Sequence, residues 1–97
     1  MGRNELVFTY VGLAIRARKV SFGVDGIISK KSKPFIVLID NTLGESGKDK
    51  LNRYTTQNNI SLFVVDMEKI YPNKNCKALG IYEKNLALTI KKQFEEK

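Results

Sequence analysis

A short stretch of the sequence concentrates residues that could hold a phosphate. It contains, in order, Arg16, Arg18, Lys19, Ser21 and Gly23, with Lys30 beyond them. A helix that begins after Gly23 would present unpaired backbone N–H groups and the positive end of its dipole, and both suit a phosphate. Cations beside the helix start add long-range attraction. The pattern therefore predicts a site that grips a nucleic-acid backbone, although a glycine N-cap flanked by solvated charges explains the spacing equally well.

Other kinds of chemistry have little support in the sequence. The chain has no histidine, so the usual Ser–His or Cys–His pair is impossible. Its one cysteine, Cys76, excludes an intramolecular disulfide and makes structural zinc improbable, and we expect it to be a core or surface thiol. Asp40 would end a strand, where α/β folds place ligand sites, but Asp40–Asn41 also serves as a turn. We therefore expect no catalytic residue, no metal ion and no cofactor.

The charge balance favours an anionic partner. Seventeen Lys and Arg face ten Asp and Glu in 97 residues, which gives a net charge of +7. Such a field suits nucleic acid first and an anionic membrane second. The length fits one domain over residues 1–97. No apolar run is long enough to span a bilayer, and the N-terminus does not resemble a signal peptide. We expect a cytoplasmic monomer that does not bind membranes.

The first half of the chain alternates helical and extended patterns. The expected elements are a helix capped by Asn4 that runs to about Ala17, an extended segment over 20–22, a helix over 24–31, a strand over 35–39 and a helix to about Gln57. The run over 35–39 is continuously apolar, which is typical of a central strand buried on both faces. Ser46 followed by Asp49 resembles a capping box for the third helix.

The second half continues the alternation. We expect a strand over 60–65, a short helix capped by Asp66 and ended by Pro72, a helical turn over 75–80, a loop over 81–85, a strand over 86–90 and a terminal helix over 91–97. Strands that alternate with helices predict an α/β fold, here a three-layer α/β/α sandwich with a central mixed four-stranded sheet.

Three stretches resemble a known family. Residues 11–23, VGLAIRARKVSFG, resemble the GLA-x-RA-x-K-x-x-x-G opening of bacterial members of the kink-turn-binding ribosomal protein superfamily. The apolar strand over 35–41 ends in two turn residues, where the family usually has Glu-Asp. The third stretch, 77–80, precedes a loop and a last strand in the expected arrangement. The likenesses occur in family order over nearly the whole chain.

The resemblance implies a ribosomal or other translation-associated protein that binds kink-turn RNA in a ribonucleoprotein. By resemblance, the start of the second helix would enter the RNA groove at tandem G·A pairs through Gly23, Val24, Asp25, Gly26 and Ser29. The loop before the last strand would pack against flipped nucleotides through Ile81, Tyr82, Glu83 and Lys84. Arg18 and Lys19 would hold phosphates. In the family motif G-x-N-E-x-x-K, the positions of Asn, Glu and Lys correspond to Asp25, Gly26 and Ser29.

Two functions remain open from the sequence. The leading hypothesis is a non-catalytic RNA-binding protein. Its expected partners are structured RNA, with ribosomal RNA among the candidates, and ribosomal or translation-factor proteins. The alternative is a protein-interaction module that keeps the fold and has lost specific RNA recognition. The departures from the family motif favour this alternative, and the broad apolar arc of the first helix, with Phe8 and Ile15, would then be the partner surface.

Overall fold

The computed structural model describes residues 2–71 and 76–95. Along them the elements are α1 (Arg3–Arg16), β1 (Val20–Phe22), α2 (Val24–Ser29), β2 (Ile36–Asp40), α3 (Glu45–Gln57), β3 (Ser61–Val65), α4 (Met67–Ile70), β4 (Ala78–Ile81) and α5 (Lys84–Glu95). None of the helices in this part of the chain is long and apolar enough to cross a bilayer.

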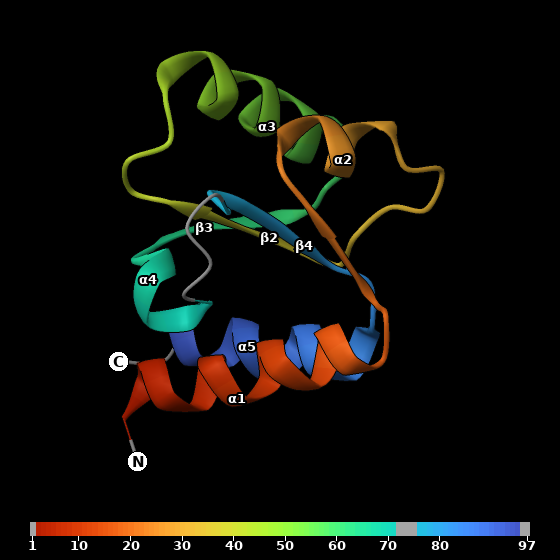
Figure 1. The fold of residues 1–97 in the computed structure, drawn as a ribbon. Helices are drawn as coiled ribbons and strands as arrows, with labels where there is room; N and C mark the ends of the chain where they lie inside the picture. Colours follow the sequence, from red (N-terminus) through yellow and green to blue (C-terminus); the bar gives the residue numbers. More distant parts are fainter. Residues whose placement is uncertain (1, 72–75, 96–97) are drawn as a thin grey trace.

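The strands form one mixed sheet in the order β1-β4-β2-β3. β4 pairs antiparallel with both β1 and β2, whereas β2 and β3 run parallel. Helices α2 and α3 cover one face of the sheet, and α1, α4 and α5 cover the other (Figure 1). The predicted α/β fold with a mixed four-stranded sheet is therefore confirmed.

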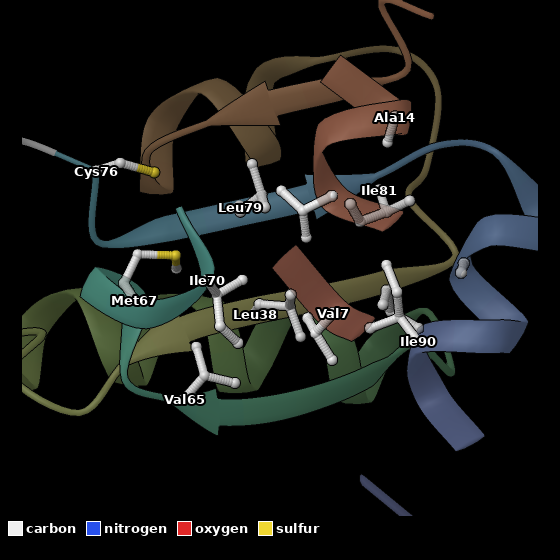
Figure 2. Packing of buried hydrophobic residues seen from close by; sticks show 13 residues of the cluster. Val7, Ala14, Leu38, Val65, Met67, Ile70, Cys76, Leu79, Ile81 and Ile90 are labelled. Carbon is white, nitrogen blue, oxygen red and sulfur yellow. The ribbon is translucent and has the colours of Figure 1, made fainter. Parts of the chain in front are cut away.

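The core lies on both faces of β2, and all five residues of this strand are buried. Successive side chains of a strand point to opposite faces. Ile36 and Leu38 accordingly join the larger cluster under α1, α4 and α5 (Figure 2), and Val37 and Ile39 join the smaller cluster under α2 and α3. The continuous apolar pattern of this strand follows from its coverage on both sides.

The predicted end of the chain is wrong. The last strand is β4, over 78–81, and the run expected as a strand over 86–90 belongs to helix α5. The reason is the spacing of its apolar residues: Ala87 and Ile90, three apart, are buried, whereas Leu88 between them is largely exposed. That is a helical period, and the carboxylate of Glu83 accepts the backbone N–H of Leu86 at 2.7 Å in the first turn.

The helical turn expected over 75–80 is also wrong for residues 78–80, which lie in β4; residue 75 is outside the described part of the chain. Gly80 explains the close packing there. A Cβ at this position would lie 3.3 Å from the Cβ of Pro34 and 3.3 Å from the Oγ of Ser21. The absence of a side chain lets neighbouring segments approach β4 closely.

Helix boundaries differ from expectation at several caps. Helix α1 begins after Gly2, whose N–H donates to the carboxylate of Glu5 at 3.2 Å, and not after Asn4. Helix α2 ends at Ser29, and α3 begins after Gly44 without the expected capping box. Asp66 does precede α4, but its side chain makes no capping hydrogen bond.

Candidate nucleic-acid interface

The predicted site residues lie at two ends of strand β1. Val20, where β1 begins, lies opposite Ile81 at the end of β4. At the other end, the N–H of Gly23 donates to the carbonyl of Ala78, where β4 begins, at 2.9 Å. Since a strand rises about 3.3 Å per residue, the turn before β1 and the start of α2 are roughly 10 Å apart.

At the first of these ends, Tyr82 connects three segments. Its N–H donates to the carbonyl of Lys19 at 2.7 Å, and its hydroxyl shares a 2.7 Å hydrogen bond with the hydroxyl of Ser21. The Nζ of Lys30 lies 4.3 Å from the centre of its ring, a cation–π contact. Lys30, directly after α2, thus lies at the same end of the sheet as Lys19, directly before β1. The structure brings Lys19, Ser21, Lys30 and Tyr82 together.

The hydroxyl of Tyr82 is held in its neutral form. Burial raises the pKa of this phenol, the hydrogen bond with Ser21 lowers it, and the neighbouring Tyr54 raises it further. Tyr82 therefore contributes a neutral hydroxyl and an aromatic face at this place.

Cations from three segments gather at this end, which we call the basic end. They are Arg16, Arg18, Lys19, Lys30, Lys31, Lys33 and Lys84, and all are exposed. The end of α1, the segment 30–35 and the turn from β4 to α5 lie at the same side of the molecule (Figure 1). The carboxylate that these segments contribute, Glu83, is engaged at the start of α5. The basic end therefore has a strong positive field.

The start of α2 lies among carboxylates. A Cβ at Gly47 would lie 3.2 Å from the Cγ2 of Val24, so the first turn of α3 is beside the start of α2. The acidic residues around the starts of α2, α3 and α4 are Asp25, Asp40, Glu45, Asp49, Asp66 and Glu68. Lys48, Lys50, Lys69 and Lys77 offset part of this charge. An anionic ligand is thus attracted less to the start of α2 than to the basic end.

Asp40 has a structural role. Its carboxylate accepts the N–H of Met67 at 2.8 Å, the N–H of Thr42 at 3.1 Å and the hydroxyl of Thr42. The hydroxyl of Thr42, above all, and the N–H of Met67 lower the pKa of this carboxyl, while burial opposes them. The bonds join the end of β2 to the start of α4, so the interpretation of Asp40 as a turn residue fits better than a ligand site.

The predicted RNA-binding loop is partly wrong. Ile81 is the last residue of β4, and Tyr82, Glu83 and Lys84 follow this last strand and do not precede it, because the strand expected over 86–90 is a helix. Ile81 is fully buried in the larger core cluster, so it has no surface to offer a ligand. Glu83 caps α5, whereas Lys84 is exposed. The segment that does precede β4 includes residues 72–75, which lie outside the described residues.

The predicted residues of α2 divide by exposure. Asp25, Gly26 and Ser29 are exposed, whereas Val24 packs against the smaller core cluster. Gly23 has φ 81°, a conformation that glycine adopts readily.

Cys76 is buried, its Sγ lies 3.5 Å from the carbonyl oxygen of Ala78, and burial raises the pKa of its thiol. Of the two expectations for Cys76, a core thiol or a surface thiol, the structure shows the core thiol.

Sequence reasoning did not include Lys31, Lys33 and Phe35 in the site. These residues lie in the segment between α2 and β2, and the structure places this segment at the basic end. The signal was present as a run of lysines next to an aromatic residue, K-K-S-K-P-F. Phe35 was assigned to the strand, which begins one residue later.

Comparison with known proteins supports the fold. No protein-family model matches the chain, and no curated protein matches it significantly. A solved structure described as that of "a protein with unknown function from Bacillus halodurans C" is similar, with a TM-score of 0.81 and 18% sequence identity. The match covers 93% of this chain and 97% of that chain. At this identity the similarity shows a shared fold.

Proposed function

We propose that the protein is a non-catalytic RNA-binding protein that holds the RNA backbone at its basic end. The observation that carries the proposal is the gathering of seven exposed cations, from Arg16 to Lys84, out of three separate segments. Proteins that neutralise phosphates in this way gain affinity by releasing counterions. The resemblance to the kink-turn-binding ribosomal proteins adds structured RNA and the translation machinery as the expected setting.

Selectivity would come from the exposed face of α2. This helix runs from Gly23 to the cation–π contact of Lys30 with Tyr82, so one RNA could lie along it and reach the basic end. Asp25 and Ser29 offer acceptor oxygens to base edges on the way. In this arrangement phosphate contacts position the RNA, and α2 reads it.

A titration with two RNAs tests the proposal. One is a kink-turn RNA, and the other is the same RNA with its tandem G·A pairs converted to Watson–Crick pairs, each measured at two salt concentrations. We expect salt-sensitive binding to both and tighter binding to the kink-turn. Equal binding would restrict the proposal to electrostatic RNA binding. Absence of binding to either RNA would contradict it.

Reversal of Lys19 to glutamate tests the phosphate contacts individually. Its backbone carbonyl is fixed by Tyr82, and its side chain is exposed at the basic end. We expect weaker binding to all RNAs alike, and a plot of log affinity against log salt that is shallower by about one unit. Lys92→Glu, on an exposed position of α5 away from the basic end, is the control. An equal effect of both changes would count against a local contact.

The alternative of a protein-interaction module retains one supporting observation. Phe8 on α1 is 50% exposed, as that interpretation requires, whereas Ile15 packs against the larger core cluster. The expected apolar surface is thus narrower than the sequence suggested. If neither RNA binds and sedimentation shows self-association that Phe8→Ala removes, this alternative would replace RNA binding.

A further inference from the structure

We infer that Phe35 is a stacking platform for an unpaired nucleobase, so that the RNA bound at the basic end includes a single-stranded nucleotide. The inference rests on the proposed RNA binding and specifies the class of RNA. It concerns a residue outside the site expected from the sequence, at the opposite end of β1 from the start of α2.

The backbone places Phe35 beside Tyr82. Its N–H donates to the carbonyl of Ile81 at 2.8 Å, and Ile36 pairs with Ile81 in the antiparallel register. Phe35 lies at a bend directly before β2, and its N–H therefore meets the peptide group that joins Ile81 to Tyr82.

The backbone of Phe35 is constrained, but its side chain is exposed. Pro34 is buried and packs close to Gly80, and its ring restricts the backbone directly before Phe35. The side chain of Phe35 is nevertheless 50% exposed. An exposed aromatic ring on a fixed backbone loses little conformational freedom when a flat ligand binds, which makes it a suitable platform.

The surrounding charges favour a nucleotide as the ligand. Lys30, Lys31 and Lys33 lie within the five residues before Phe35 and are exposed, and Lys30 lies over the ring of Tyr82. Aromatic rings interleaved with cations are typical of surfaces that bind single-stranded nucleic acid, because the base stacks while its phosphates meet the cations. An apolar protein partner would instead have to desolvate these lysines, which is costly.

Two half-exposed phenylalanines give a matched comparison. Phe8, on α1, has the same 50% exposure as Phe35 but lies on the opposite layer of the fold. The probes are an RNA hairpin with a single-stranded adenosine tail and the same hairpin with a blunt end. We expect Phe35→Ala to weaken binding of the tailed hairpin about tenfold, in line with the loss of one stacked base. Phe8→Ala should leave it unchanged, and neither change should affect the blunt hairpin.

Fluorescence gives an independent measurement. The chain has no tryptophan, so Phe35→Trp and Phe8→Trp each introduce a single tryptophan, which can be excited selectively beside the four tyrosines. We expect the tailed hairpin to quench the tryptophan at position 35 and not the one at position 8, and thermal melting should show that all variants fold.

The outcomes separate the two proposals. The tailed hairpin could bind the wild type, Phe35→Ala and Phe8→Ala with equal affinity, or it could leave the tryptophan at position 35 unquenched. Either result would show that Phe35 is not a stacking platform, while the proposal of RNA binding would stand. If the wild type binds neither hairpin, both proposals fail.

Discussion

Replacement of Lys30, Lys31 and Lys33 together by glutamine should weaken RNA binding on the order of a hundredfold at 0.1 M salt, with a salt dependence shallower by about two to three units. The three side chains are exposed in the segment that meets the end of β4, and Lys30 also loses its contact with Tyr82. Titration of one RNA over a series of salt concentrations measures both quantities. Because the changed residues lie outside the core, the melting temperature should hardly move.

The control for this variant removes the same charge elsewhere. Lys50, Lys69 and Lys92 are exposed on α3, α4 and α5. Changing these three to glutamine lowers the net charge from +7 by the same amount but leaves the basic end intact. We expect a much smaller loss of affinity. Equal losses in the two triple variants would mean that RNA responds to the total charge and not to this surface.

Replacement of Asp40 by alanine should lower the free energy of unfolding by about 3 kcal/mol, because three hydrogen bonds to a buried carboxylate are lost and the N–H of Met67 is left without its acceptor. For a domain of this size, such a loss lowers the melting temperature by roughly 12–24 °C. Asp66→Ala is the matched control, since Asp66 is exposed and makes no capping bond. If Asp40→Ala lowered the free energy of unfolding no more than the control, the role of Asp40 in connecting the end of β2 to the start of α4 would be contradicted.

The same carboxylate predicts a pH dependence. The pKa of Asp40 in the folded chain lies below its ordinary value of 3.8, so the unfolded chain takes up the proton first as the pH falls. The stabilisation is complete above that ordinary value and is lost as the pH falls through the folded pKa. Unfolding in urea should therefore show a constant difference between wild type and Asp40→Ala near neutral pH, and a shrinking difference in acid.

Sequence reasoning located the central strand and the first four helices, though not all of their caps, and it failed where a signal was short or non-local. The run over 36–39 is apolar throughout and bounded by Pro34 and Asp40, so its assignment was straightforward. The five residues 86–90 fit a strand or a helix by composition, and burial of Ala87 and Ile90 decided for a helix.

The candidate site shows the same limit. Residue types identified the cations, but only the pairing of β1 with β4 shows that Lys19 lies beside Tyr82 and Gly23 beside Ala78, at opposite ends of β1. That pairing joins residues about sixty positions apart, and no local pattern encodes it. The place of Phe35 beside Tyr82 depends on a similarly distant pairing, between β2 and β4.

The strand that comes last along the chain lies inside the sheet, between β1 and β2. During synthesis, a nascent chain that has exposed only β1, β2 and β3 cannot join β1 to the rest, because the strand that bridges them is still to come. Both the surface around Tyr82 and the core under α5 form only after residues 78–95 have left the ribosome. The domain therefore folds only after its last strand and α5 have been synthesised, and until then its apolar strands are available to chaperones.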